Sequence, residues 1–223
     1  MPNWAEQTLD LVGPETEIAR WCATGFTVPR GRLPDTALVE PTLDFESLCP
    51  RRGGDGRGKE DPYAAVLMYW RTRTQARFEF ITRWDYPRHF YRAMARHWPH
   101  LAFACAVNED MGQFGGVLVG IGGRMTDLVR TYSRGYDKKA HAKEILPHLQ
   151  QWQGVVQGGR EWRVRIREPW ETPFFRTDAT FDDDGWFYLR TEQAARRFRA
   201  RAGATSLQRH QADGRWHTVR TTR

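Results

Sequence analysis

Short apolar runs of changing periodicity in the middle of the chain constrain its fold more than any other feature. Residues 66–70 and 76–82 are rich in aromatic and β-branched side chains, as strands are. Residues 87–98 instead have apolar side chains at every fourth position, which predicts a helix with one buried face formed by Phe90, Met94 and Trp98. Residues 101–107 and 115–121 are again short and apolar, so we expect them to pair as strands.

The N-terminal part of the chain supplies two further elements. Residues 8–12 predict a short strand, and a helix is expected to begin after Gly13-Pro14, with its apolar stripe at Ile18, Trp21 and Cys22. The order strand, helix, strand, strand, helix, strand is that of the ferredoxin-like βαββαβ unit. We therefore predict such a domain over residues 1–123, with a long irregular loop at 28–61 that is rich in proline, glycine and arginine.

The remaining residues predict a second, smaller α+β module. Residues 124–152 are expected to form a connecting helical segment, and residues 153–223 the basic module itself. In residues 162–167 the apolar side chains of Trp162, Val164 and Ile166 alternate with arginines, which indicates a half-buried strand. A turn at 182–185, a strand at 186–189, a helix from Thr191 and a strand at 215–221 complete the module, and the apolar side of that helix is expected at Ala194, Ala195, Phe198 and Ala202. The predicted fold class is thus α+β.

Composition excludes several classes of protein. The 223 residues are 40% hydrophobic and 27% charged, as in an ordinary globular protein. No apolar run approaches the ~20 residues that span a bilayer, and no N-terminal secretion signal is visible. Cys22, Cys49 and Cys105 are widely spaced and predict neither disulfides nor a metal site. We expect a cytoplasmic protein of a bacterial host cell, without a membrane partner, metal or cofactor.

The charge of the chain is carried by arginine and is concentrated near the C-terminus. The net charge is +7, with thirty arginines and four lysines. Residues 151–223 contain fourteen arginines and nine acidic residues. A GC-rich genome favours arginine over lysine, but the basic charge still favours polyanionic partners.

Ten arginines form three rows with regular spacing. One row follows the helix at 87–98 in steps of about 6 Å, a second follows the polar face of the strand at 162–167, and a third crowds the last helix. Such spacings suit successive phosphates or a row of carboxylates on a protein. The alternative interpretation is a solvated face. The candidate binding residues are Arg88, Arg92, Arg96, Arg163, Arg165, Arg167, Arg196, Arg197, Arg199 and Arg201.

Three segments resemble chemical motifs but lack essential parts of them. Residues 53–59 match most of a phosphate-binding P-loop, but Glu60 replaces the Ser or Thr that would bind magnesium. Residues 112–117 partly match an RNA-binding strand motif, yet Gly116 replaces a stacking aromatic residue and a glycine-rich turn or bulge is the alternative. The aspartates at 182–184 would suit a divalent metal, but no lysine follows Lys143, and a solvated turn is the alternative. The seven histidines show no metal-ligand spacing, so no catalytic residues are assigned.

Five segments in the first two-thirds of the chain resemble the YubB-type family of plasmids and phages. They are residues 1–4 (MPNW), 70–73 (WRTR), 80–84 with Pro87 (FITRW…P), 98–101 (WPHL) and the glycine-flanked Phe114. Positions 71, 73, 85 and 86 depart from the family's segments. Over residues 1–123 the resemblance implies a ferredoxin-like domain and a mobile-element origin. It implies no activity.

These observations favour binding over catalysis. We expect a non-enzymatic protein of a phage or plasmid that inhibits host defence, in the manner of an anti-CRISPR protein, by occupying a host defence protein or nucleoprotein complex. One alternative is direct, sequence-tolerant binding of single-stranded DNA or RNA. A second alternative is a metal-dependent nuclease that uses the aspartates at 182–184.

Overall fold

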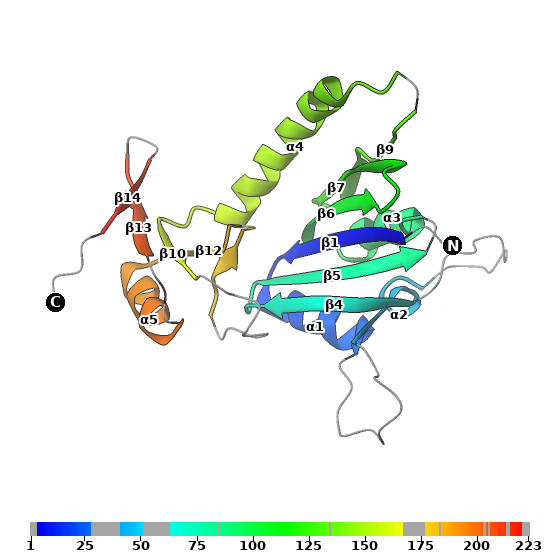
Figure 1. Ribbon diagram of the computed structural model, residues 1–223. Helices are drawn as coiled ribbons and strands as arrows, with labels where there is room; N and C mark the ends of the chain where they lie inside the picture. Colours follow the sequence, from blue (N-terminus) through cyan, green and yellow to red (C-terminus); the bar gives the residue numbers. More distant parts are fainter. Residues whose placement is uncertain are drawn as a thin grey trace, which may run out of the picture.

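The computed structural model describes residues 4–27, 41–50, 63–83, 85–133, 135–166, 177–182, 184–202, 204, 206–212 and 215–219. Over these residues the chain is a mixed α+β structure with two antiparallel sheets (Figure 1). The helices of the described segments are α1 (Glu15–Gly25), α2 (Phe45–Leu48), α3 (Arg88–His97), α4 (Lys138–Gln157) and α5 (Glu192–Ala202).

The first sheet is larger than the four-stranded unit that the sequence predicts. In the described part of the chain it has nine strands, in the order β2-β3-β4-β5-β1-β6-β7-β8, with β9 paired to β7. The central strand β1 pairs along its whole length with β5 and along most of it with β6. The strands are β1 (Trp4–Val12), β2 (Phe26–Thr27), β3 (Thr42–Asp44), β4 (Tyr63–Arg71), β5 (Gln75–Arg83), β6 (Ala102–Glu109), β7 (Phe114–Ile121), β8 (Arg124–Asp127) and β9 (Arg130–Thr131).

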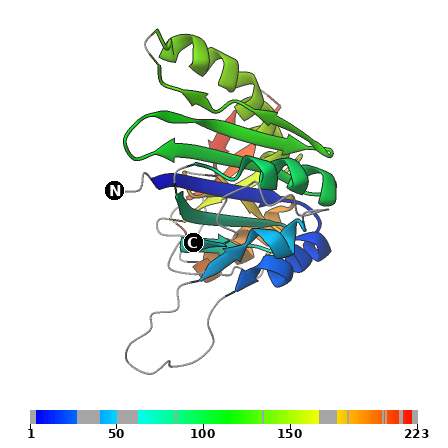
Figure 2. The same cartoon turned by 90° about the vertical axis from the view of Figure 1, so that its right-hand side faces the viewer.

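One face of the first sheet carries the larger hydrophobic core, which α1, α2 and α3 cover (Figure 2). Because side chains alternate along a strand, Leu9 and Leu11 of β1 reach this face together with Phe78 of β5. Trp21 of α1 and Tyr91 of α3 are fully buried against them. The helix expected at residues 87–98 is confirmed as α3, and the expected pairing of residues 101–107 with 115–121 is confirmed as that of β6 with β7.

The opposite face of the first sheet is partly covered by α4. Asp137 caps the start of this helix through bonds from the backbone amides of Lys139 and Ala140, at 2.9 and 3.1 Å. The C-terminal half of α4 buries Trp152 and Val156 against small and branched side chains of the sheet. In the middle of the helix, Leu146 is 53% exposed and Leu149 is 40% exposed. Near the start of the helix the buried His141 bonds to the carbonyl of Leu128 at 2.7 Å, so α4 contacts the first sheet near both of its ends and crosses this face (Figure 1).

The second sheet contains β10 (Trp162–Arg165), β11 (Thr180–Phe181), β12 (Trp186–Leu189), β13 (Ser206–His210) and β14 (Trp216–Thr218). Its order is β11-β12-β10-β13-β14. The predicted alternation of β10 is confirmed, because Trp162, Val164 and Ile166 are buried and Arg165 is exposed. Phe198 of α5 packs against this sheet, 5.1 Å from the ring of Phe187.

The two sheets meet at the turn between β4 and β5. The side chain of Gln75 donates to the carbonyl of Phe181 at 2.9 Å and accepts from its backbone amide at 2.6 Å. The hydroxyl of Thr72 donates to the carbonyl of Ala179 at 2.5 Å. Trp70 of β4 packs on Phe181 and belongs to the core of the second sheet. Side chains of the first sheet thus satisfy backbone groups of the second.

Several predicted boundaries need correction. Within the expected irregular loop at 28–61, residues 42–48 form β3 and α2, because Leu43, Phe45 and Leu48 are buried against α1 and the first sheet. The expected connecting segment begins with β8 and β9, which extend the first sheet past residue 123. In α5, Ala194 is exposed and does not belong to the apolar side. Strand β13 was not predicted.

Candidate functional site

The arginine row on α3 is not a row of three free cations. The Nε–H of Arg88 donates to the carboxylate of Asp127, and this bond raises the pKa of Arg88. The hydroxyl of Tyr86 donates to the same carboxylate at 3.2 Å. Arg92 and Arg96 are exposed, and the Nε–H of Arg96 donates to the carbonyl of Arg92 at 3.3 Å. Arg88 therefore holds α3 to the end of β8, and the other two arginines face solvent.

The arginine row on β10 is partly built into the second module. The guanidinium of Arg163 lies 4.1 Å from the ring centre of Trp186 and 4.5 Å from that of Trp216. Its Nε–H donates to the amide oxygen of Gln208 at 2.8 Å. Arg165 is exposed and lies 5.7 Å from Trp186. Arg167 lies outside the described residues. The polar face of β10 was predicted correctly, but Arg163 is a packing residue of that face.

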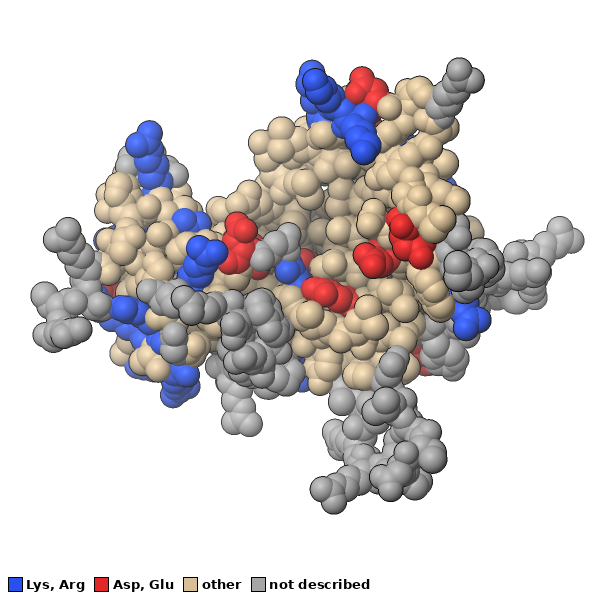
Figure 3. Space-filling model, viewed as in Figure 1, with Lys and Arg blue, Asp and Glu red and all other residues tan. Residues whose placement is uncertain are grey.

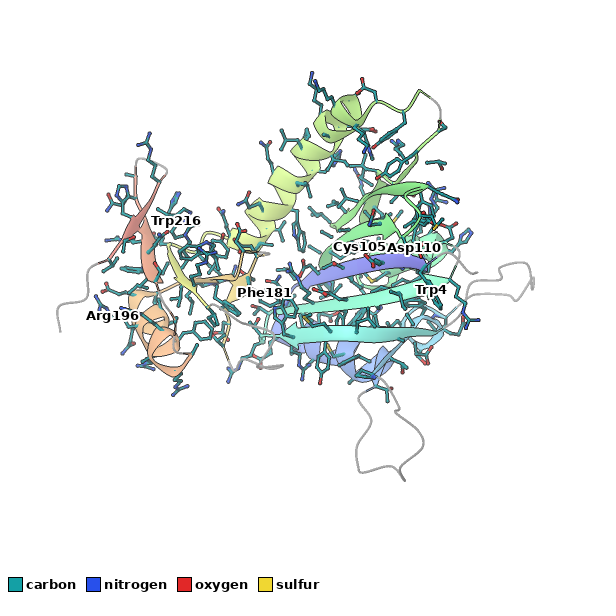
Figure 4. All side chains as sticks on the ribbon, viewed as in Figure 1. Trp4, Cys105, Asp110, Phe181, Arg196 and Trp216 are labelled. Carbon is teal, nitrogen blue, oxygen red and sulfur yellow. The ribbon has the colours of Figure 1, made fainter. Side chains whose placement is uncertain are left out.

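The third row lies on α5, and we call its four arginines the α5 arginine surface (Arg196, Arg197, Arg199 and Arg201). Ala195 and Phe198 bury the inner side of the helix, so the arginines occupy its outer and flanking sides. Arg196 forms an ion pair with Glu192 at 2.7 Å. Arg197 and Arg201 are exposed and one helical turn apart, and Arg199 is half-buried. Figure 3 shows basic side chains on the second module, and Figure 4 labels Arg196 on α5.

Asp182 serves the hairpin between β11 and β12. Its carboxylate accepts hydrogen bonds from the backbone amides of Asp184 and Trp186, both at 3.0 Å, and from the hydroxyl of Tyr188. Burial raises the pKa of Asp182. Asp183 lies outside the described residues. Among the residues that the structure describes, no group of three or more His, Cys, Asp or Glu side chains is placed to hold a metal ion.

Of the other two segments that resemble chemical motifs, the structure describes residues 112–117 but not residues 53–59. In residues 112–117, a Cβ atom at Gly116 would lie 2.2 Å from the carbonyl oxygen of Leu128, and this residue has a φ of 148°. Phe114 is half-buried and packs 6.0 Å from the ring of Tyr86. Gly116 thus lies where the backbone of residues 128–129 passes close to β7. This agrees with the alternative interpretation of the segment as a glycine-rich turn or bulge.

A cleft of about 430 Å³ lies between the first sheet and α4, and sequence reasoning missed it. Its floor is polar and comes from β1 and β5, with Thr8, Asp10, Arg77 and Glu79. Trp152 and Leu149 of α4 and small side chains of β6 form its apolar walls. Asp182 of the second module closes one end. The alternation of Thr8 and Asp10 with Leu9 and Leu11 was the available signal that β1 has a polar second face.

An ion pair between Asp10 and Arg77 forms the centre of this floor. The Nε–H of Arg77 donates to Asp10 Oδ1 at 2.7 Å, and its Nη2 donates to the second oxygen. Both side chains are buried, and the guanidinium lies over the rings of Trp70 and Phe181 at 5.2 and 5.5 Å. The pair therefore satisfies two charges that would be costly to bury alone.

Comparison with known proteins adds nothing to these assignments. The chain matches no protein-family model, no curated protein and no solved structure. Among the described helices, none combines the length and the hydropathy that crossing a bilayer requires. The structure thus offers two surfaces of opposite character, namely the α5 arginine surface and the cleft beneath α4.

Proposed function

We propose that this chain is a non-enzymatic binding protein whose second module contacts an acidic surface of a nucleic-acid-handling complex. The observation that carries the proposal is the α5 arginine surface. Arg197 and Arg201 project from a helix whose opposite side is anchored by Ala195 and Phe198. A rigid helix presents its cations at fixed spacing, which favours binding to a row of carboxylates or phosphates.

The packing of the module supports a role in recognition. Arg163 is fixed between two tryptophans, and β10 and β13 form the support on which α5 rests. A preorganised surface loses little conformational entropy on binding. The exposed Arg165 on β10 and Arg215 next to β14 add positive charge to the same module.

The biological setting of the proposal rests on the family resemblance. We propose that the chain derives from a phage or plasmid and inhibits a host defence complex, as an anti-CRISPR protein does. We also interpret β4-β5-β1-β6 with α1 and α3 as a ferredoxin-like unit that has gained strands at both edges. The support is the strand order, in which the first and third strands of that unit are central neighbours.

Phage plating tests this proposal directly. The chain would be expressed in bacterial strains that carry defined CRISPR systems and are challenged with a targeted phage. We expect plaque numbers to rise at least tenfold in a strain whose effector is the target, and Arg197→Glu with Arg201→Glu to abolish the rise. The matched control, Arg92→Glu with Arg96→Glu, makes the same charge change on α3. Equal loss in the control would assign the effect to net charge and contradict a role for the α5 arginine surface.

Direct binding of single-stranded nucleic acid is the second candidate. It is favoured by the half-exposed rings of Trp186 and Trp216 beside Arg163 and Arg165, since bases stack on aromatic rings next to cations. It predicts that affinity for plain oligonucleotides falls steeply with salt. Absence of binding at low salt would exclude it. The nuclease alternative has no such support, because the carboxylate of Asp182 is engaged by its own hairpin.

A further inference from the structure

An arginine just after α4 is buried without a counter-ion. Arg160 is only 9% exposed, and it forms no ion pair with any residue that the structure describes. Its guanidinium contacts main-chain carbonyls alone, since Nη1 lies 3.5 and 3.4 Å from the oxygens of Val156 and Gln157 and Nη2 lies 3.4 Å from that of Asp178. The Nε–H has no partner. Because arginine is rarely buried without an anion, this guanidinium calls for one.

A second arginine of the chain shows what the open edge of Arg160 can bind. Arg77 uses Nε and Nη2 together to hold both carboxylate oxygens of Asp10. This planar edge matches two oxygens of an oxyanion. In Arg160 the same edge has an unpartnered Nε–H and a contact of 3.4 Å at Nη2, which is longer than an ordinary N–H···O bond. The edge that binds a carboxylate in Arg77 is therefore unfilled in Arg160.

The end of α4 fixes the position of Arg160. The backbone amide of Arg160 donates to the carbonyl of Gln157 at 2.8 Å. Gly158 has a φ of 52°, and a Cβ atom there would lie 2.3 Å from Nη1 of Arg160, so glycine leaves room for the guanidinium to turn back over the helix. The hydroxyl of Thr180 donates to the carbonyl of Val156, which joins this end of the helix to the second sheet (Figure 1).

Arg190 lies beside Arg160 at the end of β12. In the pairing of β11 with β12, Thr180 lies opposite Tyr188. The same register, continued by two residues, places Asp178 opposite Arg190, and Arg160 contacts the carbonyl of Asp178. Burial, and after it the charge of Arg190, lowers the pKa of Arg160. Arg190 is exposed and has no ion pair in the described part of the chain. We call these two residues the arginine pair.

The neighbouring carboxylates have other arginines as their nearest cations. Asp178 Oδ1 lies 3.9 Å from Nη1 of Arg73, and the Asp178 side chain is 74% exposed. Glu161 Oε2 lies 3.9 Å from Nη2 of Arg209. Neither carboxylate forms an ion pair with the arginine pair. The fold thus holds two guanidiniums close together, and the residues that the structure describes place no anion between them.

We propose that the arginine pair binds a small phosphate dianion, as inorganic phosphate or as a phosphate monoester. The phosphate oxygens accept from the Nε–Nη2 edge of Arg160 and from the guanidinium of Arg190. A dianion matches the two positive charges, and its tetrahedral oxygens reach both residues, whereas one carboxylate fills a single edge. Because the Nε–H of Arg160 is closed to solvent, the guanidinium leaves its weak contact with Asp178 as the anion enters. The site uses no residue of the α5 arginine surface and does not depend on the proposed function.

Calorimetric titration of the full chain with phosphate, methyl phosphate and acetate, at constant ionic strength and about pH 8, tests the anion. We expect phosphate to bind with a Kd on the order of 1 mM and acetate to bind at least about tenfold more weakly. Methyl phosphate that binds at least as well as phosphate assigns the site to a monoester, and weaker binding assigns it to the free ion. Equal affinities of phosphate and acetate, or no heat from either phosphate compound at about 20 mM, would overturn the proposal.

A pair of glutamine substitutions tests the location. Arg190→Gln removes one guanidinium at an exposed position, and we expect phosphate binding to weaken at least about tenfold. Arg124→Gln is the matched control, since it removes the same charge from an exposed residue of β8 and should leave the affinity within about twofold. Equal affinities in the two variants would assign binding to net charge and overturn the location.

Arg160→Lys separates phosphate binding from capping of α4. Lysine keeps the charge and loses the planar edge, so we expect phosphate to bind at least about fivefold more weakly. Urea unfolding in phosphate and in chloride gives a second measurement, because a ligand of the native state raises the unfolding midpoint. We expect phosphate to raise the midpoint of the unmodified chain and to raise that of Arg160→Lys much less. An equal rise in both would show that Arg160 only caps the helix.

Discussion

Arg163 occupies a polar-face position on a strand, yet the structure uses it for packing. Its guanidinium fills the space between Trp186 and Trp216 and bonds to Gln208. We expect Arg163→Ala to lower the free energy of unfolding by about 1–3 kcal/mol, because two stacking contacts and a hydrogen bond are lost. Urea unfolding measures this change. Arg165→Ala is the matched control and should change stability by about 0.5 kcal/mol or less, as exposed residues do. Equal effects would contradict the packing role.

The three cysteines make a second prediction at the residue scale. Burial raises the pKa of the Cys49 and Cys105 thiols to about 12 and also raises that of Cys22. At pH 8 we therefore expect the native thiols to react with a disulfide reagent at least about a hundredfold more slowly than in urea. Because the unfolded thiols ionise near their ordinary pKa of 9.0, the free energy of unfolding should also fall as pH rises above that value. Rapid reaction of one thiol in the native protein would contradict its burial.

At the scale of elements, Gln75 joins the two sheets. Its side chain satisfies both the amide and the carbonyl of buried Phe181. We expect Gln75→Ala to lower the free energy of unfolding by about 2–4 kcal/mol, because two buried backbone groups lose their partners. The exposed Gln150 of α4 provides the control, and Gln150→Ala should change stability by about 0.5 kcal/mol or less. Tryptophan fluorescence and circular dichroism during denaturation measure both variants, and a neutral Gln75→Ala would contradict this junction.

Two glycines near the start of β7, Gly112 in the preceding turn and Gly116 in the strand, give another prediction. A Cβ atom at Gly116 would lie 2.2 Å from a backbone oxygen, so Gly116→Ala should cost about 2–4 kcal/mol of stability. Gly112 also has a positive φ, but a Cβ atom there meets nothing within 4 Å. Gly112→Ala should therefore cost only about 1 kcal/mol. Thermal unfolding of the two variants compares them, and an equal cost would show that close packing at Gly116 is not the reason for glycine there.

How far the sequence predicts an element depends on its length and its pattern. Strand β10 and helix α3 were predicted because three or more apolar residues repeat with one period in each. Strands β3, β8 and β9 are two to four residues long and mostly polar, so only pairing with a neighbouring strand stabilises them. Such pairing depends on residues far away in the sequence, and no local pattern reports it.

At the scale of the whole molecule, one candidate site follows from a local sequence pattern and the other from contacts between residues far apart in the sequence. The α5 arginine surface comes from one helix, and its spacing is visible in the sequence. The cleft combines Thr8 and Asp10 with Leu149, Trp152 and Asp182, which meet only after both sheets and α4 have assembled. The polar alternation of β1 indicated a second face, but nothing in the sequence indicated what would cover it.

The distribution of charge is the property of the whole molecule that the proposed function depends on. The α5 arginine surface lies on the second module, away from the cleft, whose described lining includes Asp10, Glu79 and Asp182 beside Arg77 (Figure 3). A partner with an acidic surface would therefore be attracted to the second module and repelled from the cleft. This polarity predicts that binding depends on where the arginines lie and not only on the net charge of +7.

Affinity capture from a bacterial lysate, divided into nuclease-treated and untreated halves, tests the central claim most directly. The unmodified chain would be compared with Arg197→Glu/Arg201→Glu, and the bound proteins identified by mass spectrometry. We predict that a defined nucleic-acid-handling complex is captured in both halves by the unmodified chain and in neither half by the variant. Capture that disappears with nuclease would contradict direct binding to the complex, and capture that the variant retains would contradict the α5 arginine surface.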